Sequence, residues 1–257
     1  MNEWYQAIVP KDYFIDKFYQ VEGFLGCMEK DKVMVLYFEK RDSVLELLKG
    51  LDISVITEGD WVENWKEYFV PVKMGSFTVV PPWRAKEGNL IINPARGFGT
   101  GHHETTKLAA GLIEEILRSD DTVKSLIDVG TGSGILAIAA SKLRKDMEIK
   151  AIDNDCDAIE NAFENLMLND VVARIELSDT PLFKHKRPFD VVAANIISSV
   201  LYFLSDDLKR LSSRWLVFSG VLDSESDTFL QKMELEDFEL IKKVKDSEWN
   251  GFLLKRR

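Results

Sequence analysis

The stretch that decides the fold is Leu126–Leu136, which reads LIDVGTGSGIL. Its residue order predicts a buried strand, a glycine turn and the first turn of a helix. Glycines at every second position, Gly130, Gly132 and Gly134, let a ligand approach the backbone closely, where a Cβ atom would collide with it. Asp153 follows on the next predicted strand, from where a carboxylate in an open α/β sheet can hold a ribose. We therefore expect a nucleoside cofactor at this turn.

The spacing of the glycines indicates which class of nucleoside cofactor the turn would bind. A dinucleotide site typically reads G-x-G-x-x-G, whereas this turn reads G-x-G-x-G and continues with Ile135. Asp128, directly before the first glycine, would repel a pyrophosphate but suits a cofactor that carries positive charge. S-adenosylmethionine carries an ammonium and a sulfonium. The turn, Asp128 and Asp153 together favour this methyl donor, and the alternative is a tight strand-to-helix turn that binds no ligand.

Helices and strands alternate regularly around the turn. Helices are predicted at Glu104–Arg118, Ile135–Lys142, Asp157–Asn169 and Ile196–Leu211. Strands are predicted at Phe77–Val80, Leu90–Ile92, Ser125–Val129, Glu148–Asp153, Arg174–Leu177, Phe189–Ala194, Trp215–Ser219, Phe238–Val244 and Trp249–Lys255. This order is typical of an α/β fold with a doubly wound, mostly parallel sheet, to which a terminal hairpin adds antiparallel strands. We expect a seven-stranded Rossmann-like sheet.

The beginning of the chain has a different order of elements. Strands are predicted at Trp4–Val9, Leu25–Glu29, Val33–Phe38 and Ile53–Ile56, and helices at Lys11–Tyr19 and Ser43–Leu51. The order β-α-β-β-α-β is that of a ferredoxin-like α+β unit, which by itself assigns no function. We therefore expect a ferredoxin-like domain at residues 1–56, a linker helix at 57–70 and the domain with the glycine turn at 71–257.

Composition limits the class of protein and its partners. The 257 residues carry a formal net charge of −10, which speaks against tight binding to a nucleic-acid backbone and is compatible with a basic protein or polyamine substrate. The two cysteines, Cys27 and Cys156, lie in different predicted parts of the chain and indicate no disulfide framework. We see no signal-peptide pattern and no run as long as a membrane span, so we expect a cytoplasmic protein.

Asn195 directly follows the predicted strand Phe189–Ala194. Ligands of open α/β sheets bind beyond the carboxyl ends of the strands, so Asn195 belongs beside the crevice of the glycine turn. Its side-chain carbonyl can accept a hydrogen bond from a substrate amine and direct the nitrogen lone pair at a methyl group. Ile196 and Ile197 replace the two prolines usual in enzymes that methylate bases or glutamine, which favours an alkyl amine. The alternative role of Asn195 is a helix N-cap.

The segment Arg96–Thr106 leads into the helix before the glycine strand and is rich in glycine. Thr105 and Thr106 lie on the first turn of that helix, where their hydroxyls and the helix dipole can bind the methionyl carboxylate. His102-His103-Glu104 is not a metal signature, because neighbouring side chains point apart, and we expect no metal.

From about residue 60 onward the chain resembles the methyltransferases that modify ribosomal protein L11 of the large subunit (the PrmA type). The resemblance rests on Asp60–Phe69, Gly99–Thr106, Asp128–Gly134, Ala194–Ile196, Ser219–Leu222 and Glu248-Trp249. It implies donor contacts from Thr106, Gly130, Asp153 and Asn195, and we add Phe98, Thr105, Asp128 and Gly132 as candidates. It also implies methylation of lysine side chains and of the N-terminal amine of L11, with Asn195 as the catalytic residue and the ferredoxin-like domain recognising the substrate.

Two other functions remain open at this point. One is methyl transfer to a small free amine, which the acidic composition also suits. The other is a chaperone of ribosomal protein or RNA that keeps a relic cofactor fold without catalysis. We expect a monomer that binds neither a membrane nor nucleic acid tightly.

Overall fold

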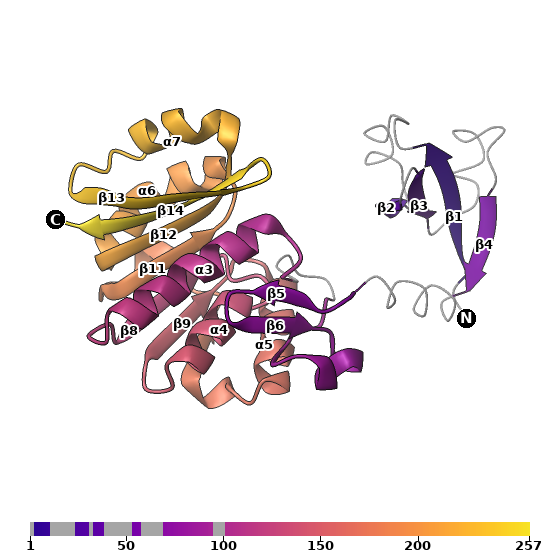
Figure 1. Ribbon diagram of the computed structural model, residues 1–257, viewed down its shortest axis with the longest axis horizontal. Coiled ribbons are helices and arrows are strands. Elements are labelled where there is room, and N and C mark those ends of the chain that lie inside the picture. Colours follow the sequence, from indigo (N-terminus) through magenta and orange to yellow (C-terminus); the bar gives the residue numbers. More distant parts are fainter. Residues whose placement is uncertain (1–2, 11–23, 31–32, 39–52, 58–68, 95–100) are drawn as a thin grey trace. The chain divides into compact units, whose positions relative to one another are not determined.

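The computed structural model describes residues 3–10, 24–30, 33–38, 53–57, 69–94 and 101–257. The chain divides into two compact units, Met1–Phe69 and Val70–Arg257 (Figure 1). The helices predicted at 11–19 and 43–51, the centre of the predicted linker helix and the segment that contains Phe98 lie outside the described residues.

The first unit contains a sheet of four antiparallel strands in the order β2-β3-β1-β4. The strands are β1 (Glu3–Pro10), β2 (Phe24–Lys30), β3 (Val33–Phe38) and β4 (Ile53–Thr57), and each overlaps a predicted strand. Ala7 and Val9 alternate with exposed Ile8 on β1 and are fully buried, as are Leu36 and Phe38 on β3. One face of this sheet therefore carries its own apolar core.

The second unit is built on a mixed sheet of seven strands in the order β10-β9-β8-β11-β12-β14-β13. The strands are β8 (Ser125–Val129), β9 (Glu148–Ile152), β10 (Ile175–Ser178), β11 (Phe189–Asn195), β12 (Ser212–Leu222), β13 (Phe238–Asp246) and β14 (Trp249–Arg256). The first five pair in parallel, and β14 runs antiparallel to both β12 and β13. The chain leaves β8 toward one edge and returns to β11 on its other side, so a topological switch point lies between β8 and β11. The predicted seven-stranded α/β sheet is confirmed.

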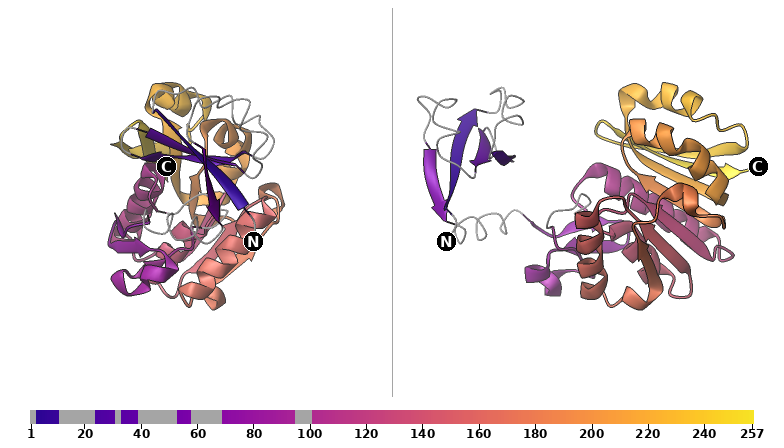
Figure 2. Two further views of the ribbon diagram at one scale, coloured as in Figure 1. Left: turned by 90° about the vertical axis from the view of Figure 1, so that its right-hand side faces the viewer. Right: turned by 180° about the vertical axis from the view of Figure 1, so that it is seen from behind.

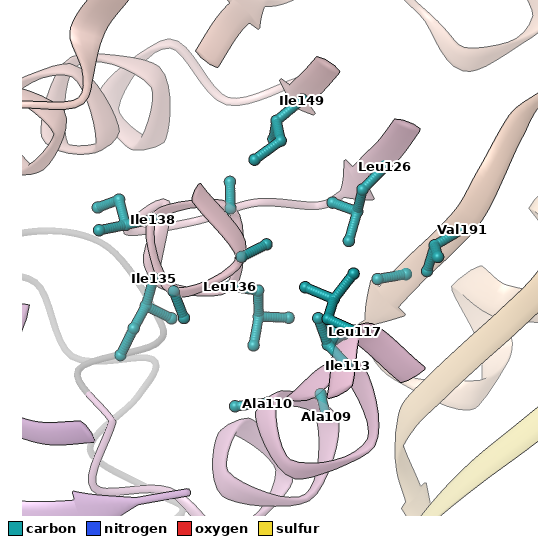
Figure 3. Close-up of a cluster of buried hydrophobic side chains, with 14 of the residues drawn as sticks. Ala109, Ala110, Ile113, Leu117, Leu126, Ile135, Leu136, Ile138, Ile149 and Val191 are labelled. Atoms are coloured by element: carbon teal, nitrogen blue, oxygen red, sulfur yellow. The ribbon is translucent and has the colours of Figure 1, made fainter. Parts of the chain in front are cut away.

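Helices cover both faces of the sheet (Figures 1 and 2). Helices α3 (Glu104–Ser119), α4 (Ile135–Leu143) and α5 (Cys156–Leu168) cover one face, and α6 (Ser198–Leu211) and α7 (Ser226–Lys232) cover the other. Successive residues of β8 point to opposite faces, so Leu126 packs with the first group and Ile127 with the second. Figure 3 shows side chains of α3 and α4 gathered over Leu126, Ile149 and Val191. This packing fixes the carboxyl ends of the central strands.

Smaller elements complete the unit. A three-stranded sheet contains β5 (Val72–Met74), β6 (Phe77–Val80) and β7 (Leu90–Ile91). The described residues also contain 3-10 helices η2 (Pro82–Glu87), η3 (Val172–Arg174), η4 (Leu182–Lys184) and η5 (Asp223–Glu225). Strand β5 and helix α7 were not predicted. Among the described residues, no helix combines the length and the apolarity needed to cross a membrane.

Candidate donor and amine site

The glycine turn after β8 is tied to the end of β9. Gly130, Gly132 and Gly134 all have positive φ angles, of 70°, 55° and 79°, which other residues rarely adopt. The amide of Gly132 donates to Oδ2 of Asp153 at 2.9 Å, and the amide of Asp155 donates to Oδ1 at 3.1 Å. Asp153 therefore holds the glycine turn through Oδ2 and the loop after β9 through Oδ1, and each oxygen keeps a further lone pair for a ligand hydroxyl.

Asp128 lies at the same edge of the sheet and is almost fully buried, with 1% of its surface exposed. Its Oδ2 accepts a hydrogen bond from the hydroxyl of Thr131 at 2.7 Å, while its Oδ1 is buried without a hydrogen-bond partner. Burial raises the pKa of Asp128 to about 6; the Thr131 hydroxyl and the backbone amide of Ala137 oppose the rise, and the nearby Asp153 carboxylate adds to it. A buried carboxylate oxygen without a partner fits a ligand that brings positive charge.

Asn195 ends β11 at the other side of the switch point. Its Nδ2 donates to the hydroxyl oxygen of Thr106 at 3.4 Å, and its Oδ1 is buried without a hydrogen-bond partner. Helix α6 begins only at Ser198, with Ile197 as its N-cap and no side-chain capping bond. The alternative role of Asn195 as a helix N-cap is therefore wrong, and its carbonyl oxygen still lacks a hydrogen-bond partner.

The first turn of α3 packs against the ends of β11 and β12. His103 is the N-cap residue: its Nδ1 accepts a bond from the amide of Thr105 at 3.3 Å and lies 2.8 Å from the Thr105 hydroxyl. The hydroxyl of Ser219, on β12, donates to the carbonyl oxygen of Thr105 at 3.0 Å. The His103 ring also meets the ring of Trp249 edge to face, with centroids 5.3 Å apart. Thr105 and Thr106 are therefore buried anchors of the helix, and the Thr106 hydroxyl contacts Asn195.

The candidate residues that the structure describes lie at the carboxyl ends of β8, β9 and β11 or on the first turn of α3. They are Thr105, Thr106, Asp128, Gly130, Gly132, Asp153 and Asn195. Phe98 lies outside the described residues. Within the described ranges, no three His, Cys, Asp or Glu side chains gather as metal ligands would. The roles of Ser219 and of buried asparagines on α5 were missed, although the spacing of Asn161, Asn165 and Asn169 by four residues was a visible signal.

Comparisons with known proteins agree on one family. The family model described as ribosomal protein L11 methyltransferase (PrmA) matches residues 2–257. A ribosomal protein L11 methyltransferase of Geotalea uraniireducens is 36% identical over 224 residues, which cover 80% of this chain and 71% of that protein. One of Clostridium perfringens is 34% identical over 255 residues and covers 88% and 80% of the two chains.

A solved structure shows that the fold also agrees with this family. The crystal structure of a ribosomal protein L11 methylase from Lactobacillus delbrueckii subsp. bulgaricus matches with a TM-score of 0.65 and 29% identity, over 73% of this chain and 98% of that chain. The family model covers nearly the whole sequence and the relatives exceed 30% identity. The chain therefore belongs to the family of ribosomal protein L11 methyltransferases and is an S-adenosylmethionine-dependent methyltransferase.

Proposed function

We propose that this protein methylates lysine ε-amino groups and the N-terminal α-amine of ribosomal protein L11, with Asn195 orienting the amine. The observation that carries the proposal is the buried Oδ1 of Asn195, which has no hydrogen-bond partner and lies at the carboxyl end of β11. A buried carbonyl oxygen costs free energy unless a donor meets it, and a substrate N–H is such a donor. Because L11 is a ribosomal protein, the reaction belongs in the cytoplasm.

The residues around the glycine turn fit the donor. Asp153 would hold the ribose through the lone pairs that Gly132 and Asp155 leave free. The unpartnered Oδ1 of Asp128 would compensate positive charge, and Thr106 would complete the site beside Asn195. When bound, S-adenosylmethionine supplies the methyl group, and its sulfonium makes the thioether a good leaving group.

Asn195 would align the amine rather than remove its proton. An amide oxygen accepts a hydrogen bond but is not a base at neutral pH, so the ammonium form of the substrate must lose a proton before it attacks. Positive charge close to an amine lowers the pKa of that amine, which favours the neutral form in the site. One hydrogen bond from the neutral amine to Oδ1 leaves the nitrogen lone pair free to point at the methyl carbon.

The first unit would recognise the substrate. The order β2-β3-β1-β4 with antiparallel pairing supports a ferredoxin-like domain, because a split β-α-β unit produces this strand order. We propose the domain bounds 1–56, 57–70 and 71–257; the last boundary lies within about a residue of the division between Phe69 and Val70, which supports it. The net charge of −10 would steer a basic ribosomal protein toward the enzyme and disfavour tight binding to nucleic acid.

The test is transfer of a labelled methyl group from S-adenosylmethionine to purified L11, followed by mapping of the labelled residues. Label on lysines and on the N-terminal amine is the expected result, and Asn195→Ala should transfer far more slowly. Absence of label on L11, with a wild-type enzyme that binds S-adenosylhomocysteine, would overturn the proposed substrate.

A truncated chain, Val70–Arg257, tests the role of the first unit. It should bind S-adenosylhomocysteine as the full chain does but should lose methyl transfer to L11. If this unit methylates L11 as fast as the full chain, the first unit does not recognise the substrate. Transfer to free lysine or other small amines by both forms would favour a small-molecule substrate instead.

A further inference from the structure

A row of three asparagines follows one face of α5 and ends at its C-cap residue, Asn169. Asn161, Asn165 and Asn169 follow one another at intervals of four residues, which places them on the same side of a helix. All three are buried, with exposed fractions of 4%, 0% and 7%. Burying an amide side chain costs free energy unless its donors and its acceptor find hydrogen-bond partners. The partners of these asparagines therefore show which segments the side chains connect.

Asn165 joins the glycine turn to a distant segment. Its Nδ2 donates to the carbonyl oxygen of Ser133 at 2.9 Å, inside the turn. Its Oδ1 accepts a hydrogen bond from the amide of Asn93 at 2.7 Å. One side chain therefore connects α5, the turn after β8 and the segment that follows β7.

Helix α5 also packs directly on the turn. A Cβ atom on Gly134 would lie 3.3 Å from Cβ of Ala162 and 3.3 Å from Cδ1 of Leu166, which leaves little room between helix and turn. Backbone bonds from Gly130 and Thr131 to the carbonyl oxygen of Ile152 hold the start of the turn, and side chains of other elements hold it at two further, neighbouring points. The Gly132 amide is bound by Asp153, and the Ser133 carbonyl is bound by Asn165.

We infer that Asn165 is a positioning residue for the methyl donor. By fixing the Ser133 carbonyl it fixes the backbone turn that presents Gly132 to Asp153, the proposed ribose acceptor. Without this bond the peptide between Ser133 and Gly134 keeps only the bond from its Gly134 amide to the carbonyl oxygen of Thr131, at 2.9 Å, so the turn is less ordered and the donor must complete its ordering when it binds. That ordering costs conformational entropy and lowers affinity. The inference rests on the proposed function, in which this turn binds S-adenosylmethionine.

Asn169, the C-cap residue of the same helix, provides a matched control. Its Oδ1 accepts a bond from the amide of Ile91 at 3.0 Å, and its Nδ2 donates to the carbonyl oxygens of Ile91 and Asn165 at 2.6 and 2.8 Å. Its burial and its bonding are similar to those of Asn165, but none of these bonds reaches the glycine turn. A purely structural role predicts the same consequences for both asparagines.

The experiment compares Asn165→Ala with Asn169→Ala in the full chain. We would measure the Kd for S-adenosylhomocysteine by calorimetry, the Tm, and the KM for S-adenosylmethionine with L11 as substrate. Both variants should lower the Tm. Asn165→Ala should raise the Kd and the KM at least fivefold with kcat at saturating donor within twofold, whereas Asn169→Ala should leave the Kd within twofold. Equal changes of Kd in the two variants would overturn the inference.

Asn165→Asp provides a second variant if Asn165→Ala does not fold. It keeps the oxygen that accepts from Asn93, loses the donor to Ser133 and to Oδ1 of Asn161, and places a buried carboxylate oxygen beside the Ser133 carbonyl, so its Kd should rise at least as much. An unchanged Kd in this variant would also overturn the inference. A wild-type enzyme that binds S-adenosylhomocysteine but transfers no methyl group to L11 would refute the proposed substrate alone, because the Kd comparison needs no substrate protein.

Discussion

The amide of Gly132 donates a hydrogen bond to Oδ2 of Asp153 over 2.9 Å, which joins the turn after β8 to the residue that follows β9. The carboxylate thus has two tasks: it orders the turn, and it remains able to accept hydrogen bonds from a ribose. The two tasks support each other, because an ordered turn presents its amides and the carboxylate in one arrangement before the donor arrives.

Replacing Asp153 with Ala should weaken binding of S-adenosylhomocysteine by about 1–3 kcal/mol, the cost of removing charge-assisted hydrogen bonds. Calorimetry measures this change. Asp155→Ala is the control: Asp155 caps α5 by accepting from the amide of Asp157 at 2.9 Å, so its loss should lower stability by about 1 kcal/mol with affinity maintained. An Asp153→Ala variant that binds as tightly as the wild type would disprove the ribose role.

Replacing Asn195 with Ala should slow methyl transfer to L11 by about 10- to 100-fold, because the amine loses the acceptor that aligns it. Asn195→Asp would keep an oxygen acceptor but place a third carboxylate at the edge of the sheet that carries Asp128 and Asp153. Single-turnover kinetics with saturating donor separates the rate of transfer from donor affinity. A transfer rate that stays within twofold of the wild-type rate would remove Asn195 from the mechanism.

Parts of this architecture were predictable because they depend on local sequence. The strand Ser125–Val129 and the start of α4 at Ile135 were predicted without error, since a continuous apolar run and a glycine turn mark both. Strand β5 has only three residues, and α7 only seven, so neither shows a periodicity that can be recognised. Strand β12 extends beyond the predicted Trp215–Ser219 at both ends, because polar Ser212 pairs with β11 and the residues after Gly220 continue the pairing with β14 past a register shift.

The candidate site also has a part that was predictable from the sequence and a part that was not. Asp128, Asp153 and Asn195 were predictable because each stands at the carboxyl end of a strand, where the topology of the sheet brings them to one edge. The partners of Asn165 were not predictable, because they lie 32 and 72 residues away in the sequence and only the packing of α5 brings them together. Buried polar contacts of this kind follow from tertiary structure rather than from periodicity.

Phe229 should be among the most important residues for the stability of the second core. It is fully buried, and its ring lies 5.2 Å from that of Phe252 and 5.9 Å from that of Phe218. Phe229→Ala should lower the free energy of unfolding by about 3–5 kcal/mol, through lost burial and a residual cavity. Phe203 is 87% exposed on the same side of the sheet, so Phe203→Ala should change the free energy of unfolding by less than about 0.5 kcal/mol. Urea unfolding of both variants checks the difference, and equal effects would contradict the core assignment.

Asp128 should make stability depend on pH. Its pKa rises from 3.8 to about 6 because burial disfavours the charged form, so the folded state binds this proton more tightly than the unfolded chain does. The contribution of Asp128 to stability is therefore fully present below pH 3.8 and is lost as the pH rises through 6, a loss of about 3 kcal/mol. Asp128→Asn has no such proton, so its stability relative to the wild type should increase between pH 4 and 7 in urea unfolding.

Affinity for the donor should depend on pH in the opposite direction. Ionised Asp128 favours a cationic ligand, so the Kd of the wild type for S-adenosylmethionine should fall as the pH rises from about 5 to 7. Asp128→Asn should bind more weakly and should lack this component of the pH dependence. Calorimetry across this pH range measures the Kd of both proteins. Both contain the same histidines, so any effect of histidine titration on the Kd cancels in the comparison. If the two pH profiles run parallel, ionisation of Asp128 does not contribute to donor binding, and the buried carboxylate serves only to hold Thr131.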